Sequence, residues 1–405
     1  MAMKNKEAVI SKEATINKET AVNKEVTVNT VQNAPAHKKR MANMELLRIL
    51  AMMMVVMLHY LSKGKVLPDM TGPLTVNGYI AHILETLSIV AVNVYMLISG
   101  FFLVESGFKC RRLIQLVCQV LFYSVLIPPV LIALGILSPA QLDIYSLLRY
   151  VLPAEMEHYW FVTAYVVMYL FSPVLSTAVK HMKKRQLQYT IILLLLFFSV
   201  NKSILPVHLE MDRYGYDGIW FICVYLAAAY MRLYGIAFFD HAKRGFICYL
   251  GSCAGILGIA LGIRIVFLET GRLENLIRVT YDYNHILNLF AAISLFYGFY
   301  YCKLKEGWFS RLVIKTAPYT FGVYLLHEHL NLRSLWPMWM RPVTTGNPVI
   351  FILRCLVSVF LVFAAGIVVD MLRGLIFKGV GHLLKGSRAD RFLKKIDERM
   401  AGQEE

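Results

Sequence analysis

Charged residues are scarce in this sequence. They make up 17% of its 405 positions, against 58% hydrophobic residues. A soluble globular chain has about 25% charged residues and about half apolar ones. Together with a mean hydropathy of +0.55, this balance excludes an ordinary soluble domain. It predicts an all-α polytopic membrane protein, because helices satisfy their own backbone hydrogen bonds in lipid.

The sequence also lacks any motif of metal ligands or of disulfide-forming cysteines. The seven cysteines include no CxxC pair and no zinc-type spacing, and Cys110 and Cys302 fall in connections that we place in the cytoplasm, where thiols stay reduced. The run His327-Glu328-His329 is not HExxH, and on a helix its two histidines would point about 200° apart. We therefore predict neither a disulfide framework nor a metal site.

A strong charge of one sign is present, with a formal net charge of +16. Such a charge can indicate nucleic-acid binding. Here the basic residues form short clusters between apolar runs, as the positive-inside rule predicts for membrane proteins. We expect the lipid bilayer as a partner, no nucleic acid, and a multi-pass protein of the cell membrane.

Ten apolar runs each come near the ~20 residues needed to cross a bilayer. They cover 44–62, 79–103, 112–137, 159–179, 188–207, 217–235, 246–268, 283–302, 317–336 and 349–377. Basic connections alternate with mixed or acidic ones along the chain. Ten spans with both termini in the cytoplasm fit this alternation. The last run is longer than one span requires, so it tilts or continues past the interface.

The two ends of the chain differ from this membrane domain. Residues 1–40 repeat the pair Lys-Glu at 6–7, 12–13, 18–19 and 24–25 and carry no continuous apolar core. This composition predicts a disordered tail and excludes a signal peptide. We expect the membrane domain over 41–380 and a basic cytoplasmic tail over 381–405.

The run 44–62 carries three ionisable side chains, Glu45, Arg48 and His59. On a helix, Arg48 and His59 lie about 20° apart in angle and roughly 16 Å apart along the axis, and Glu45 is about 40° from His59. Ionisable groups inside a bilayer face a protein interior or a wet cavity. We interpret Glu45 as the structural partner of Arg48 at i,i+3 and His59 as functional.

Arg48, ten intervening residues and His59 on the first membrane helix resemble the signature of the acyltransferase-3 family of integral membrane O-acyltransferases. Three further segments are similar to that family, in the same order along the chain: VAVNVYMLISGFFL, YWFVTAYVVMYLFSPVL and TFGVYLLHEHL. The resemblance covers most of the chain after residue 43. It implies an acyl-CoA donor in the cytoplasm, as a co-substrate and not a bound cofactor, and an acceptor hydroxyl on a cell-envelope or exported glycan.

The roles of the catalytic candidates follow from what acyl transfer requires. A base must take the proton of the acceptor hydroxyl, and the thioester and its oxyanion must be held. His59, whose ordinary pKa is near 6.5, suits a general base or a transient acyl carrier. Arg48 suits the extended arm of the donor. A basic cluster comprising Lys109, Arg111 and Arg112 resembles the family's Arg-x-x-Arg motif with a displaced first position, and it suits a phosphorylated donor; positive-inside bias alone also explains it.

The acceptor side has four candidates, which are Glu85, Trp160, His327 and Glu328. Glu85 either orients His59, accepts hydrogen bonds from a hydroxylated substrate, or pairs with His82 at i+3. Trp160 is either a sugar platform or part of the interfacial aromatic belt. One of the two histidines beside Glu328 faces the cavity, and the sequence leaves open whether this is His327 or His329.

Asp370 and Arg373 are expected to form a structural pair.

Two other function classes remain open at this stage. A transporter or flippase for a glycolipid or polyprenol-linked sugar would also place charges inside ten spans, although no inverted repeat of interrupted helices is visible. A membrane sensor would need an output domain, and neither end resembles one. The acyl group, the acceptor, direct or His-acyl transfer and the oligomeric state are not fixed by the sequence.

Overall fold

A computed structural model describes residues 40–156, 158–204 and 213–400. The chain falls into two units, Met1–Met41 and Ala42–Glu405, and only Arg40 and Met41 of the first are described. The prediction for the Lys-Glu tail therefore lies outside the described residues. Within the described part of the second unit the regular elements are all helical, and no strand occurs there.

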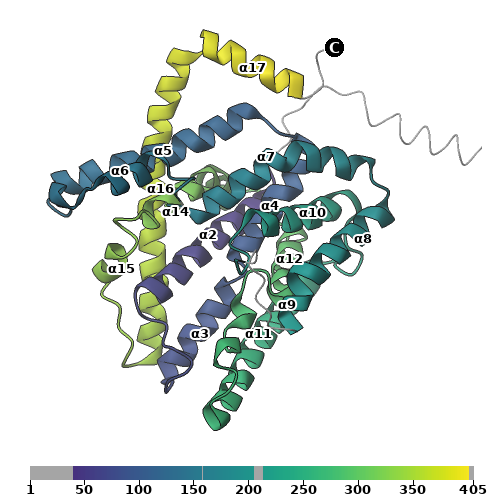
Figure 1. The fold of residues 1–405 in the computed structure, drawn as a ribbon, viewed down its shortest axis with the longest axis vertical. Helices are drawn as coiled ribbons and strands as arrows, with labels where there is room; N and C mark the ends of the chain where they lie inside the picture. The colour runs from purple at the N-terminus through teal and green to yellow at the C-terminus, as the bar shows by residue number, and fades with distance from the viewer. Residues whose placement is uncertain (1–39, 157, 205–212, 401–405) are drawn as a thin grey trace, which may run out of the picture. The chain divides into compact units, whose positions relative to one another are not determined.

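The helices of the second unit are shown in Figure 1. They are α2 (Ala42–Lys63), α3 (Val76–Ser88), α4 (Ala91–Ser106), α5 (Cys110–Ala133), α6 (Ile144–Val151), α7 (Trp160–His181), α8 (Lys184–Leu195), α9 (Asn201–Ile204), α10 (Gly218–Tyr234), α11 (Ala242–Thr270), α12 (Ile286–Tyr300), α13 (Trp308–Thr316), α14 (Thr320–His327), α15 (Leu335–Trp339), α16 (Pro348–Leu384) and α17 (Arg388–Met400).

Seven helical stretches among the described residues are long and apolar enough to cross a membrane. They are α2, α3 with α4, α5, α7, α8 through α9, α11 and α16. This confirms the prediction of an all-α polytopic membrane protein. The other three predicted runs form the shorter helices α10, α12 and α14, of 17, 15 and 8 residues. Ten spans and cytoplasmic termini stay a prediction.

Two predicted runs differ from the helices observed. The run 79–103 is divided, because α3 ends at Ser88 and α4 begins at Ala91. The run 317–336 stops early, because α14 ends at His327 and the chain then turns before α15. Polar residues follow His327 and form contacts elsewhere in the fold. The helix therefore ends where these tertiary contacts replace its own backbone hydrogen bonds.

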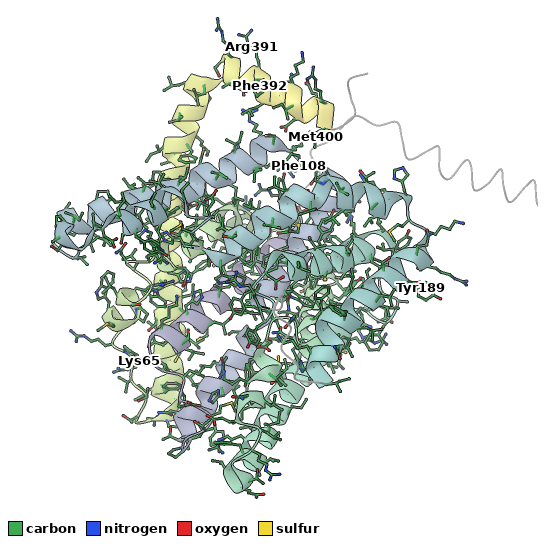
Figure 2. All side chains as sticks on the ribbon, viewed as in Figure 1. Lys65, Phe108, Tyr189, Arg391, Phe392 and Met400 are labelled. Carbon is green, nitrogen blue, oxygen red and sulfur yellow. The ribbon has the colours of Figure 1, made fainter. Side chains whose placement is uncertain are left out.

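The segment predicted as a basic tail is largely helical. α16 has 37 residues, about 55 Å at 1.5 Å per residue, so it exceeds one span as expected. α17 follows and lies beside the start of α5, where Asp397 accepts a hydrogen bond from Cys110 N at 2.6 Å and Asp390 pairs with Arg111 at 2.8 Å. Its exposed Phe392 and Met400 are labelled in Figure 2.

The helix α2 is enclosed by its neighbours. It packs against α3, α4, α12, α13, α14 and α16, which places its polar stripe inside the protein and not against lipid. Figure 2 shows Lys65, just after α2, and Phe108, just before α5, on opposite sides of the packed side chains. The chain therefore returns across the bundle between them through α3 and α4.

A buried aspartate fixes α14 against α5 and α16. Arg373 binds both oxygens of Asp370, at 2.6 and 2.9 Å, in the structural pair that the sequence predicts. Gln119 and Tyr123 of α5 donate to the same carboxylate at 3.0 and 2.9 Å. Gly322 of α14 packs directly on it, since a Cβ there would lie 2.2 Å from the carboxylate carbon. These bonds compensate the cost of burying the charge.

Candidate functional site

His59 and His327 lie side by side where α2 meets the end of α14. His59 Nδ1 is 2.8 Å from His327 Nε2 and 3.2 Å from Glu328 Oε2. His327 is the last residue of α14 and Glu328 is its C-cap, so the helix end points both side chains at α2. His327 is thus the histidine of the pair that faces His59, whereas His329 lies against His158 and Ser124.

The hydrogen-bond network assigns the protons of the two imidazoles. His327 Nδ1 is 2.6 Å from the carbonyl oxygen of Val323, which can only accept, so Nδ1 carries the proton and Nε2 is the acceptor. His59 then donates through its own Nδ1. This leaves His59 Nε2 as the unprotonated nitrogen, the state that a general base requires.

Glu328 places a negative charge beside this pair. Its side chain is buried and forms an ion pair with Lys63, one turn after His59 on α2, and Arg333 lies 3.9 Å from the same oxygen, Oε1. The other oxygen, Oε2, has no hydrogen-bond partner among the described residues. That free oxygen is the one that lies near His59, so it can stabilise an imidazolium there.

A small enclosed cavity of about 30 Å³ adjoins His59. This volume holds only one or two water molecules. Its walls are mainly aromatic and include Tyr95 of α4, Trp160 and Phe161 of α7, and Tyr324 of α14. The rings contact one another, with Phe161 5.8 Å from Tyr324 and 6.3 Å from Tyr95 between centroids. Access to His59 is thus restricted to small groups.

A second cavity, of about 240 Å³, contains Arg48. Arg112 at the start of α5 lines it too, and its guanidinium donates to Ser106 at 3.1 Å. Ser99, Tyr165 and Tyr169 contribute hydroxyl groups to the lining. The cavity therefore combines two arginines with hydroxyl groups, and Arg48 is held by Glu45 at 2.6 Å. This composition suits a phosphorylated or otherwise anionic ligand.

The two cavities follow one another along the same three helices. Each helix gives both cavities a residue, α4 through Ser99 and Tyr95 and α7 through Tyr165 and Phe161, in each case one turn apart. On α2 the pair is Arg48 and Met52, with His59 two turns further on. Phe161 of the smaller cavity stacks on Tyr165 of the larger one, with ring centroids 6.2 Å apart.

The structure places the other predicted residues as follows. Glu45 pairs with Arg48 at 2.6 Å, which confirms the structural role predicted for Glu45. Within the basic cluster, Arg112 lines the larger cavity, whereas Arg111 pairs with α17. Lys109 exchanges backbone hydrogen bonds with the hydroxyl of Tyr169, at 3.0 and 3.1 Å.

Glu85 lies in a separate polar group. Arg278 binds it at 2.5 Å and His82 Nδ1 lies 3.3 Å from it, which is the pairing with His82 that the spacing allowed. The carboxylate beside His59 is that of Glu328, so Glu328 takes the orienting position that was one alternative for Glu85. A substrate role for Glu85 stays a prediction.

The cluster of His59, His327 and Glu328 is also the one group among the described residues whose ligand atoms, all within 4.8 Å of each other, could hold a metal ion. Two nitrogens that bind one tetrahedral zinc at about 2.0–2.1 Å lie about 3.3 Å apart. The observed 2.8 Å is instead a hydrogen-bond distance, and Lys63 already neutralises the carboxylate. The geometry favours a hydrogen-bonded histidine pair, and the absence of a metal stays a prediction.

Sequence reasoning missed Lys63, Tyr95, Phe161 and Tyr324. Lys63 had a signal, because it follows His59 by four residues and so lies on the same face of α2. The sequence contains no comparable signal for the three aromatic residues, because the apolar runs in which they lie hold many such side chains. Their position around His59 depends on how α4, α7 and α14 pack.

An all-α membrane protein with a hydrogen-bonded histidine pair and a cavity lined by two arginines fits the class of integral membrane transferases. The comparison with protein families agrees: the acyltransferase domain model of the acyltransferase-3 family matches residues 41–368. The chain belongs to that family and is a membrane acyltransferase. No curated protein and no solved structure matches it.

Proposed function

We propose that the protein transfers an acetyl group from cytoplasmic acetyl-CoA to a hydroxyl of a cell-envelope or exported glycan, in the cell membrane. The observation that carries this proposal is the alignment of the Arg48 cavity with the His59 cavity along α2. Residues on one face of α2 would then bind the donor at Arg48 and carry out the acyl transfer at His59.

The donor would bind through the larger cavity. The phosphates of CoA need fixed cations, and Arg48 and Arg112 supply them within about 240 Å³. From Arg48 to His59 the rise along the helix is roughly 16 Å, so an extended arm must carry the thioester from the larger cavity toward the smaller one. Arg48 therefore acts on the donor's arm, and His59 acts at the thioester.

His59 Nε2 would act as the general base. It takes the proton of the acceptor hydroxyl while that oxygen forms a bond to the thioester carbon. The tetrahedral intermediate then collapses, the carbon–sulfur bond breaks, and the proton moves from His59 to the leaving thiolate as CoA is released. Throughout, His59 Nδ1 stays bonded to His327, and Glu328 offsets the positive charge of the imidazolium. A His59-acyl intermediate would use the same nitrogen.

The size of the inner cavity supports acetyl as the group transferred. About 30 Å³ holds only one or two water molecules, so a small acyl group fits beside the surrounding rings better than a longer chain does.

Aromatic residues on the acceptor side support a sugar as the acceptor. Trp160 stacks on Tyr283 with centroids 5.8 Å apart, and Tyr216, which is 41% exposed, lies 4.4 Å from Trp160. Such rings present flat apolar faces to the C–H groups of a sugar while their polar edges remain available for hydrogen bonds.

The test is release of free CoA by the purified protein when acetyl-CoA and a glycan acceptor are added. His59→Ala should lower turnover by 10²–10⁴-fold, the usual contribution of a general base. His181→Ala, at the exposed end of α7, is the matched control and should keep full turnover. Wild-type protein that moves a glycolipid across vesicles without releasing CoA would support a carrier instead. Near wild-type turnover by His59→Ala would remove His59 from the mechanism.

A further inference from the structure

The last helix of the described chain, α17, has no buried residue. It packs on α5 and is joined to α16 by the short connection 385–387, in which Gly386 has a φ of +77°. Glycine adopts this backbone conformation without steric cost, which allows the chain to turn sharply there. The helix is therefore a surface element, and its contacts with α5 hold it in place (Figure 1).

Two carboxylates of α17 make polar contacts with the first turn of α5. Asp397 accepts a hydrogen bond from the backbone N–H of Cys110 at 2.6 Å, and Asp390 pairs with Arg111 at 2.8 Å. The two aspartates are seven positions apart and so lie on one face of the helix. The first turn of a helix attracts negative charge, because its N–H groups have no partner within the helix. Both carboxylates thus lie at the positively charged end of α5.

The same end of α5 adjoins the larger cavity. Arg112 and Tyr169 both line that cavity. The hydroxyl of Tyr169 is fixed at the start of α5 by its two hydrogen bonds to the backbone of Lys109. Arg112 and Asp397 both lie close enough to this hydroxyl to act on it electrostatically. The carboxylate of Asp397 therefore lies near the end of the cavity at which α5 begins.

We propose that α17 is an autoinhibitory strap that competes with the donor for this end of α5. This inference rests on the function proposed above. A CoA donor held by Arg48 and Arg112 brings its phosphates close to the first turn of α5, where the carboxylates of α17 lie in the free protein. Phosphates and carboxylates repel each other, so the donor displaces α17 when it binds. The closed position of α17 lowers the apparent affinity for the donor, because only the open form binds it.

The contacts of α17 are weak enough for this exchange. The side chain of Arg111 is 55% exposed, and solvent screens an ion pair in such a position. Two of the apolar side chains of α17, Phe392 and Met400, stay exposed (Figure 2). Release of α17 therefore breaks two exposed polar contacts and leaves the buried core unchanged.

The test neutralises both carboxylates in the full chain, in the double variant Asp390→Asn/Asp397→Asn. The KM for acetyl-CoA should fall by about 3- to 10-fold, as for the loss of two exposed charge contacts, while kcat stays nearly unchanged. The melting temperature in detergent should also stay nearly unchanged, since α17 has no buried residue. Glu398→Gln is the matched control. It removes a negative charge from the same helix, but Glu398 pairs within α17, with Lys394 at 3.7 Å, so the KM should be unaltered.

Hydrogen exchange adds a measurement that needs no turnover. Addition of CoA to the wild-type protein should speed exchange of the α17 amides, because the strap is displaced. In the double variant the same amides should exchange fast with or without CoA. Slower exchange of α17 on addition of CoA would overturn the proposal, since it would show that α17 closes on the donor.

The outcomes separate this proposal from the one on which it rests. Wild-type protein that releases no CoA from acetyl-CoA would overturn the proposed function itself. Normal CoA release together with an unchanged or raised KM in the double variant would overturn the strap alone, and a raised KM would make α17 part of the donor site. An equal fall in the KM of the Glu398→Gln control would also count against the strap, because it would indicate a general effect of charge.

Discussion

Glu328 contacts Lys63 and His59, and the two contacts should have separable effects. One oxygen pairs with Lys63, and the other lies 3.2 Å from His59 Nδ1. At that distance and an effective dielectric constant of about 20, a full charge on His59 would interact with the carboxylate by about 5 kcal/mol. Lys63 opposes part of this, because its positive charge acts on the same imidazolium. We therefore expect Glu328→Gln to lower kcat by about 10²-fold, equivalent to about 2.7 kcal/mol.

The same substitution should also destabilise the fold. Glu328→Gln leaves the ammonium of Lys63 without its carboxylate in a largely buried site, and breaking a buried pair from one side costs about 3–5 kcal/mol. Removing both charges avoids this cost. The double variant Lys63→Met/Glu328→Gln should therefore recover most of the lost stability.

The assay measures the melting temperature in detergent and kcat from CoA release for the wild type, both single variants and the double variant. We expect the double variant to regain its melting temperature but not its kcat, because no carboxylate then faces His59. Full recovery of kcat together with stability would refute the reasoning, since it would show that Glu328 serves only to neutralise Lys63.

Four further predictions follow from the fold and the cavities. Gly322→Ala should destabilise the protein by about 1–3 kcal/mol, because a Cβ there overlaps a buried carboxylate; Gly251→Ala, with open space around it in α11, should raise the melting temperature slightly. Phe161→Ala should extend donor use from acetyl-CoA to butyryl-CoA, seen as a ratio of kcat/KM values that shifts by about 10-fold or more, whereas the exposed Phe171→Ala should keep the wild-type ratio. Arg48→Lys keeps the charge but loses the planar fork, so it should raise the KM for acetyl-CoA more than it changes kcat. Chelators should leave CoA release unchanged, and inhibition reversed by added zinc would instead point to a metal at the His59 cluster.

Regular periodicity explains what the sequence could predict. The stripe with Arg48 and His59 depends only on helix geometry, and both residues lie on α2 and line cavities of the protein interior. The i,i+3 pairs Glu45–Arg48 and Asp370–Arg373 were predictable for the same reason, because each partner is local in the chain.

Contacts between distant residues explain what the sequence could not predict. Lys63 and Glu328 are 265 positions apart, and Arg278 and Glu85 are 193 apart. The end of α14 at His327 depends on such contacts, so apolar composition alone extended that run to residue 336. The aromatic wall around His59 likewise forms only when three helices pack, and no local pattern distinguishes Tyr324 from the other tyrosines of the membrane runs.

The histidine pair ends at a backbone carbonyl, and this limits where a proton can go. His59 donates to His327, and His327 donates to the oxygen of Val323, which cannot take up a proton and pass it on. The pair is therefore closed at one end and cannot conduct protons. Within this pair, a proton that His59 accepts at Nε2 has no exit through His327. The histidine pair can therefore keep a reactive imidazole inside the protein without forming a proton path through α14.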